Sequence, residues 1–324
     1  MLISSMPVSA LFLLGGLALL VWSSDRFVDG AKGIARHLGV SPFVIGMIIV
    51  GFGTSLPEML VSGLAAHDGN LGLALGNAYG SNIANIALIL AVTALIKPIR
   101  VESQILRREM PILLAASVLA YLLVVDHNLS RGDAGGLLLF FLLLIGWSMR
   151  EGMGKHDDLL VAEIEHELAL QKEVSIGKSS WQALYGLVLL VAGSRLLVSG
   201  AVNIASALGV SDLVIGLTIV AIGTSLPELA SSIVAIRKGE DEIAFGNIVG
   251  SNLFNTLAVV GIAGLVGPGQ VPPDVSRRDL PVMIGLTLVL LIFSYGKQGH
   301  GRINRYEATA LLIFFVAYTA WLIS

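Results

Sequence analysis

The chain contains one hexapeptide twice: Gly53-Thr54-Ser55-Leu56-Pro57-Glu58 recurs as Gly223-Thr224-Ser225-Leu226-Pro227-Glu228, 170 residues later. Aligned at this offset, residues 38–62 and 208–232 are identical at 16 of 25 positions without a gap. A second motif, Gly80-Ser81-Asn82, recurs as Gly250-Ser251-Asn252 at the same offset. Because chance would give about one or two identities, the sequence indicates an internal duplication.

The composition places both copies in a membrane. Of the 324 residues, 55% are hydrophobic and 13% are charged, and the mean hydropathy is +0.84. A soluble domain carries about 25% charged residues, so this chain has too little polar surface for water. Soluble enzymes, nucleic-acid binders and disordered proteins are therefore excluded, and the lipid bilayer is the expected partner. The absence of cysteine excludes disulfides and thiolate metal sites.

Ten apolar runs are long enough to cross the membrane as helices. They lie near 8–28, 40–66, 71–96, 109–125, 134–149, 181–204, 210–236, 242–266, 279–295 and 306–323. The predicted fold is an all-α membrane protein with ten transmembrane helices. The predicted organisation is a five-helix repeat at 1–150, a linker at 151–178 and a second five-helix repeat at 179–324. Because five is odd, the second repeat must enter the membrane from the opposite side, which gives inverted repeats.

The distribution of basic residues predicts the orientation. If both termini are outside, the inner segments carry 16 of the 20 Lys and Arg residues, as the positive-inside rule requires. Where the first repeat has Arg26, Lys32 and Arg36, the second has uncharged residues, whereas His67-Asp68 of the first becomes Arg237-Lys238 in the second. We therefore expect a multi-pass protein of the cell inner membrane, with residues 151–178 cytoplasmic. Arg277-Arg278 is the exception, because it lies on the predicted outer side.

Two carboxylates lie within the apolar runs. Glu58 and Glu228 each follow a long uncharged stretch, and a charge inside a membrane span normally faces a partner or a polar cavity. Thr54 and Thr224 precede them by four residues and share their helix faces. Pro57 and Pro227 cannot donate a backbone hydrogen bond, so a broken helix with free carbonyl groups is expected at each motif.

The second motif supplies further oxygen ligands. Ser81 and Asn85 lie four residues apart on the third span, and Ser251 and Asn255 on the eighth. Two carboxylates with hydroxyl, amide and carbonyl oxygens, and without sulfur, favour a hard cation such as Ca²⁺ or Na⁺. Either type of ion could neutralise the buried acids, whereas an empty site would leave them unpaired. This pattern predicts obligatory exchange of cations.

These duplicated motifs resemble the α-repeats of the sodium/calcium exchangers, in the cation/Ca²⁺ exchanger superfamily. The resemblance covers essentially the whole chain and implies four ion sites at the centre of the membrane. It implies that Glu58 and Glu228, joined by Thr54 and Thr224, bind Ca²⁺. It also implies that Ser81, Ser251 and the carbonyl groups of Gly51 and Ala221 help to hold Na⁺, and that spans 1 and 6 slide against the other helices. Asn255 departs from some members, which have Asp there.

The predicted function is a secondary antiporter that exchanges Na⁺ for Ca²⁺ by alternating access. The main alternative is a Ca²⁺/H⁺ antiporter with Glu58 and Glu228 as proton carriers, and the sequence does not decide between them. An intramembrane hydrolase and a channel are also considered, but the repeated Ser and Asn partners favour ion exchange. We expect no enzymatic activity, no cofactor, no nucleic acid and no obligate protein partner; Na⁺ and Ca²⁺ are the expected substrates.

Overall fold

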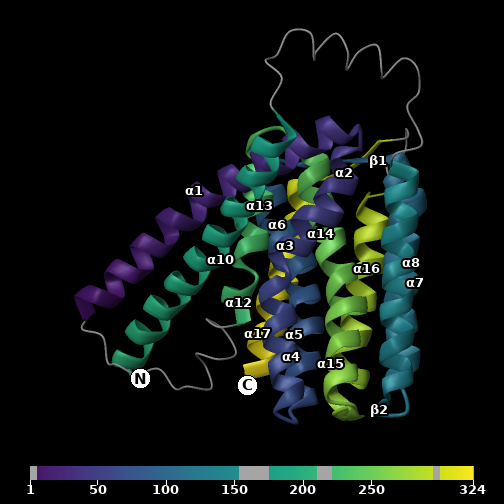
Figure 1. Cartoon of the computed structure of the whole chain (residues 1–324). Helices are drawn as coiled ribbons and strands as arrows, with labels where there is room; N and C mark the ends of the chain where they lie inside the picture. Colours follow the sequence, from purple (N-terminus) through teal and green to yellow (C-terminus); the bar gives the residue numbers. More distant parts are fainter. Residues whose placement is uncertain (1–5, 153–174, 210–220, 295–299, 324) are drawn as a thin grey trace.

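The computed structural model describes residues 6–152, 175–209, 221–294 and 300–323. Helices dominate, and most run along one common direction to form a bundle (Figure 1). The predicted linker at 151–178 falls mostly outside the described residues, as does the first half of the predicted seventh span. The described part of the chain forms ten helical passes, so the all-α, ten-helix prediction is confirmed, with four short strands in addition.

The first half contains five passes. In chain order its elements are α1 (Met6–Leu38), α2 (Pro42–Ile45), the π-helical turn η1 (Gly46–Val50), α3 (Gly51–Thr54), α4 (Leu56–His67), α5 (Leu71–Ala84), the π-helical turn η2 (Asn85–Leu90), α6 (Ala91–Ile96), β1 (Ile99–Glu102), α7 (Ser103–Val124), β2 (Asn128–Leu129) and α8 (Arg131–Gly152). The second pass consists of α2 to α4, and the third of α5 to α6.

The second half repeats this order. Its elements are α10 (Ile176–Ala207), α12 (Ala221–Thr224), α13 (Leu226–Arg237), α14 (Asp241–Leu253), η4 (Phe254–Val259), α15 (Val260–Val266), β3 (Gly269–Gln270), η5 (Val275–Asp279), α16 (Leu280–Ser294), β4 (His300–Ile303) and α17 (Arg305–Ile323). By length and composition alone, five described helices could each cross a membrane, and the bent pair at Pro42–Thr54 and Leu56–His67 could form a sixth. The other passes are shorter, interrupted or carry charges near an end.

The strands show that the two halves are inverted. β1 pairs antiparallel with β4, and β2 pairs antiparallel with β3. Within the halves, however, the equivalent strands are β1 and β3, which follow the third pass, and β2 and β4, which follow the fourth. β1 lies at the upper end of the bundle and β2 at the lower end (Figure 1). Equivalent loops of the two halves therefore lie at opposite ends, as the inverted-repeat prediction requires.

The first and sixth passes, α1 and α10, lie side by side and lean away from the other helices (Figure 1). They are 33 and 32 residues long, or about 50 Å at 1.5 Å per residue, which exceeds a hydrocarbon core of about 30 Å. A side chain at Gly186 would place its Cβ 2.6 Å from the backbone nitrogen of Phe27. The two helices therefore pack backbone against backbone, a contact that only small residues permit.

The end predicted for the first span is wrong. The apolar run ends near residue 28, but α1 continues to Leu38. Ala31 and Ile34 are buried along this extension, as is Phe27 just before it, and their spacing of three to four residues forms one apolar helix face. Arg26, Lys32 and Arg36 therefore lie on the helix rather than in a loop. Lys32 forms an ion pair with Glu240, in the connection between α13 and α14.

The central passes make a close contact of their own. At Gly250 of α14 an added Cβ would meet the carbonyl oxygen of Met47 and lie 2.7 Å from the Met47 Cα atom. We predict that Gly250→Ala lowers the melting temperature in detergent by several degrees, because overpacking costs about 1–3 kcal/mol. Gly285→Ala is the matched control, since no described atom lies within 4 Å of its Cβ position. Equal melting temperatures for both variants would contradict the contact.

Candidate cation site

The two repeated hexapeptides form helix breaks at the centre of the bundle. α3 ends at Thr54, and α4 begins at Leu56, with a bend of 45° between the helices. Ser55 (φ −84°, ψ 2°) and Ser225 (φ −91°, ψ 7°) have nearly the same backbone conformation. Pro57 and Pro227 follow two residues later, so the predicted breaks are present in both halves. The freed carbonyl group of Gly223, four residues before Pro227, accepts a hydrogen bond of 2.8 Å from Ser194 Oγ of α10.

Glu58 and Glu228 lie just after these breaks, in the first turns of α4 and α13. Glu58 is fully buried and Glu228 is 1% exposed, and the two carboxylates are close enough to interact electrostatically. Each approaches the other half of the chain. Ser55 Oγ donates to Glu228 Oε1 over 3.3 Å, and Glu58 lies close to Thr224 and Ser225. The breaks therefore bring both acids to one place from opposite directions.

Several buried polar atoms of the acids, and of the π-helical turns η2 and η4 that pack against α13 and α4, lack protein partners. Among the described residues, the buried side-chain atoms without a hydrogen bond include Glu58 Oε1 and Oε2, Glu228 Oε2, Ser225 Oγ, Asn85 Oδ1, and Asn255 Oδ1 and Nδ2. Unsatisfied polar atoms in a protein interior are rare and costly. Because most of these atoms are oxygens, the cluster has the chemistry of a site for a hard cation.

The structure also joins Thr54 to the second motif of the other half. Thr54 Oγ1 lies 3.5 Å from Ser251 Oγ and donates to Val50 O over 3.0 Å. Ser251 Oγ in turn donates to the carbonyl oxygen of Gly51 over 3.4 Å. Three of the predicted ligands, Thr54, Ser251 and Gly51, therefore meet where α3 packs against α14.

The remaining predicted residues lie on the same helices. Asn85 begins the π-helical turn η2, and Asn255 lies in the equivalent turn η4; such turns often occur at functional sites. Asn85 Nδ2 donates to Asn252 Oδ1 over 3.0 Å, which leaves its oxygen as the free end. Ser81 is buried one turn before Asn85. Ala221 begins α12, and the residues immediately before it lie outside the described residues.

Sequence reasoning missed several polar residues beside the acids. Ser55 and Ser225 belong to the duplicated hexapeptide, yet only their threonine neighbours were predicted as ligands. Asn77 and Asn247, duplicated at the same offset of 170, contact the helices that carry the two acids. Asn77 Nδ2 lies 3.3 Å from Glu58 O, and Asn247 Nδ2 lies 3.1 Å from Glu228 O. The duplication itself could have identified all four.

Comparisons with known proteins show the family to which the chain belongs. The sequence profile of the family described as "Sodium/calcium exchanger protein" matches residues 8–150 and 178–324. The chain belongs to the sodium/calcium exchanger family. It is 48% identical to CaxA of Alkalimonas amylolytica, over 98% of this chain and 100% of that protein. It is also 35% identical to the sodium/calcium exchanger MaX1 of Methanosarcina acetivorans, over 96% of this chain and 97% of MaX1.

Solved structures of the sodium-calcium exchanger NCX_Mj have the same fold. One of them, soaked with Na⁺ and Sr²⁺, superposes with a TM-score of 0.84 at 31% sequence identity and covers 97% of this chain and 98% of that one. Another, soaked without Na⁺ and Ca²⁺, has the same TM-score and 32% identity, with 98% and 99% coverage. Together with the family match, this similarity identifies the chain as a multi-pass membrane exchanger with Na⁺ and Ca²⁺ as substrates.

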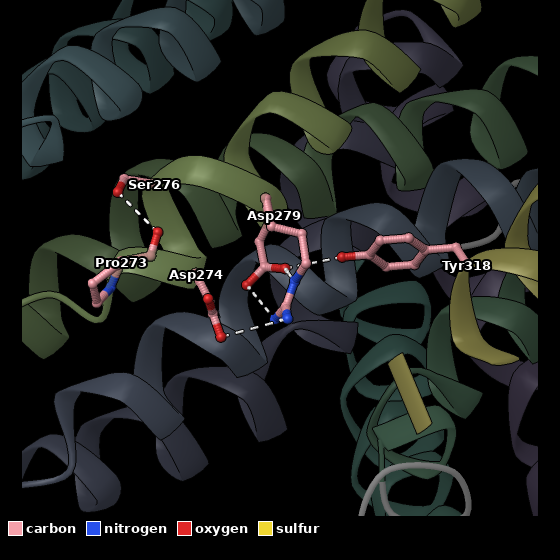
Figure 2. A network of polar contacts seen from close by, with 6 residues as sticks. Pro273, Asp274, Ser276, Asp279 and Tyr318 are labelled. Carbon is pink, nitrogen blue, oxygen red and sulfur yellow. Dashed lines mark hydrogen bonds and ion pairs between the residues drawn. The ribbon is translucent and has the colours of Figure 1, made fainter. Parts of the chain in front are cut away.

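A second polar network lies away from this site and accounts for Arg278, one residue of the Arg277-Arg278 pair. Arg278 Nε donates to Asp279 Oδ1 over 2.8 Å, and its NH1 lies 3.6 Å from Asp274. Tyr318 of α17 donates to Asp279 Oδ1 over 2.9 Å. Figure 2 shows Tyr318 and Asp274 on opposite sides of Asp279. The network therefore ties the start of the ninth pass to the tenth. Arg277 is exposed, and no described contact accounts for it.

We predict that Arg278→Ala lowers the melting temperature by several degrees. Asp279 is nearly buried, with 12% of its side chain exposed, and loss of its charged donor costs about 1–3 kcal/mol. Arg277→Ala is the matched control and should change the melting temperature by less than about one degree, as expected for an exposed residue. A larger fall in melting temperature for Arg277→Ala than for Arg278→Ala would refute the structural role of Arg278.

Proposed function

We propose that this chain works as a secondary antiporter of the cell inner membrane, which exchanges Na⁺ for Ca²⁺ across the bilayer by alternating access. One observation carries the proposal: two buried carboxylates from opposite halves of the chain lie close together, and three of their four oxygen atoms have no protein partner. Among the described residues, no group of three or more His, Cys, Asp or Glu side chains is arranged so that it could hold a metal ion. Two acids with neutral oxygens fit a transported cation better than a permanently bound metal.

The ligands that we propose are those that the sequence predicted. They are Glu58, Glu228, Thr54, Thr224, Ser81, Ser251, Asn85, Asn255 and the carbonyl groups of Gly51 and Ala221. Ser55 and Ser225 join this set because of their contacts with the opposite acids. In this arrangement one Ca²⁺ would balance the charges of both carboxylates, whereas each Na⁺ would balance the charge of one carboxylate. An unloaded site would leave two buried charges uncompensated, which opposes movement of an empty transporter and couples the two ions.

The proposed organisation follows the sequence prediction: repeats at 1–150 and 179–324, joined by a cytoplasmic linker at 151–178. Both described ends of the chain, the start of α1 and the end of α17, lie at the lower end of the bundle (Figure 1). We assign this end to the outside because most basic residues fall at the opposite end. We also propose that the chain has no enzymatic activity and that it works without a cofactor or an obligate protein partner.

Ion flux in reconstituted vesicles tests the function. We predict that vesicles loaded with Na⁺ take up Ca²⁺ when diluted into Na⁺-free medium, and that equal Na⁺ on both sides stops this uptake. Uptake that ignores the Na⁺ gradient and follows a pH gradient would replace this proposal by Ca²⁺/H⁺ exchange. Uptake without any counter-ion would indicate a channel.

In the same assay, Glu58→Gln and Glu228→Gln should each lower exchange to less than about one-hundredth of the wild-type rate, because each removes one of two charges that compensate Ca²⁺. Glu307→Gln is the control, since Glu307 lies in the first turn of α17, away from the site. Size-exclusion profiles should be the same for all three variants. Normal exchange by either site variant would remove that glutamate from the proposed ligands.

The orientation has a separate test, because the chain contains no cysteine. Arg131 and Arg150 are exposed near opposite ends of α8. We predict that a membrane-impermeant maleimide, applied to spheroplasts, labels the Arg131→Cys variant and not the Arg150→Cys variant. Both variants should react after the membranes are disrupted. The opposite pattern in intact spheroplasts would reverse the proposed topology.

A further inference from the structure

Asn247 is a buried polar residue that none of the predicted ligand sets includes. It lies in α14, which packs against both α3 and α13, and it is fully inaccessible to solvent. Its amide nitrogen donates to Glu228 O over 3.1 Å and to Ser232 Oγ over 2.9 Å. Its Oδ1 accepts from Thr54 Oγ1 over 3.2 Å. Both amide hydrogens and the amide oxygen are thus engaged, and only one orientation of the amide satisfies all three contacts.

These contacts join the two halves of the chain at the candidate cation site. The nitrogen end holds the first turn of α13, from which the Glu228 side chain extends. The oxygen end lies against Thr54, the last residue of α3. One amide therefore links a hydroxyl group of the first half to the turn of the second half that carries Glu228. Neither contact uses an oxygen of the Glu228 carboxylate, so both leave it available to a cation.

The contact with Thr54 also affects the direction of its hydroxyl proton. A hydroxyl has one proton to donate and two lone pairs. The two closest acceptors of the Thr54 proton are Val50 O at 3.0 Å and Asn247 Oδ1 at 3.2 Å. Whichever of these acceptors receives the hydrogen bond, the Thr54 oxygen keeps its lone pairs free for a cation. Without Asn247, the Thr54 proton would have only the backbone carbonyl oxygens of its own helix as acceptors, Val50 O at 3.0 Å and Gly51 O at 3.4 Å.

The first half contains the same arrangement around Asn77. Its amide nitrogen donates to Glu58 O over 3.3 Å and to Ser62 Oγ over 2.9 Å. Asn77, Glu58 and Ser62 correspond to Asn247, Glu228 and Ser232 at the offset of 170. The same pair of amide donations therefore occurs beside both acids, immediately after each duplicated hexapeptide begins its helix.

We propose that Asn247 and Asn77 are positioning residues for ion exchange, which hold the carboxylate-bearing turns of α13 and α4 in the geometry that binds the cation. Asn247 has the additional task of orienting the Thr54 hydroxyl. This inference rests on the proposed exchange function, and it adds two residues that act through the ligands rather than on the ion itself.

The test compares Asn247→Ala with Ser232→Ala in Na⁺-driven Ca²⁺ uptake. Asn247→Ala removes the links to Glu228 O and Thr54, so KM for Ca²⁺ should rise about tenfold while the maximal rate per folded transporter falls less than about threefold. Ser232→Ala removes one partner of Asn247 and neither link to the ligand residues, so KM should stay within about twofold of wild type. An unchanged KM in Asn247→Ala, or an equal rise in both variants, would overturn the proposal.

Thermal shifts separate positioning from a loss of folding. Without ions, Asn247→Ala and Ser232→Ala should melt at similar temperatures, whereas added Ca²⁺ should raise the melting temperature of Asn247→Ala less than that of Ser232→Ala. Equal shifts with Ca²⁺ would count against the proposal. If Asn247→Ala does not fold, the same measurements are made on Asn77→Ala, because Asn77 is less buried. Ser62→Ala is then the control, and the same outcomes support or overturn the proposal. Failure of wild-type exchange would instead refute the proposed function.

Discussion

Two carboxylates buried in a membrane-embedded bundle constrain the rest of this structure. Glu58 and Glu228 have almost no exposed surface, and a charge in such surroundings is costly unless other charges or dipoles compensate it. The surrounding features all reduce that cost. The helix breaks bring a hydroxyl group of one half near the acid of the other, as where Ser55 Oγ donates to Glu228 Oε1, and amide groups hold the turns that carry the acids. The compensation is incomplete within the protein, since most of the carboxylate oxygens have no described hydrogen-bond donor. In the proposed function a transported cation completes it.

The inverted repeat explains why these features occur in pairs. Each half provides one acid, one break and one amide-bearing helix, and antiparallel insertion turns the two sets toward each other. Hydrogen bonds then cross between the halves, as from Ser55 to Glu228 and from Thr54 to Asn247. The site consequently depends on close helix contact, which Gly250 permits by leaving room for the backbone of Met47. A bulkier residue there would push the second pass away from the eighth.

Much of the fold could be predicted from sequence because hydropathy and duplication are strong patterns. The ten passes, the inversion and the chemistry of the motif around Glu58 followed from them. The end of α1 could not be predicted from hydropathy, because its last turns alternate charged residues with a narrow buried face. The π-helical turns at Asn85 and Asn255 also leave no clear pattern, since a widened turn depends on tertiary packing. The contacts of Asn247 could not be predicted from sequence, because its partners include one backbone carbonyl oxygen and a residue 193 positions away.

The two small sheets have a consequence for how such a chain could arise and be assembled. Neither β1 nor β2 finds its partner in its own half, because β1 pairs with β4 and β2 pairs with β3. A five-helix half synthesised alone would expose two unpaired strand edges, one at each membrane surface. Two antiparallel copies of the same half would cover both edges at once. The strand pairing is thus compatible with an ancestral antiparallel dimer, and it makes each half of the present chain a poor candidate for independent folding.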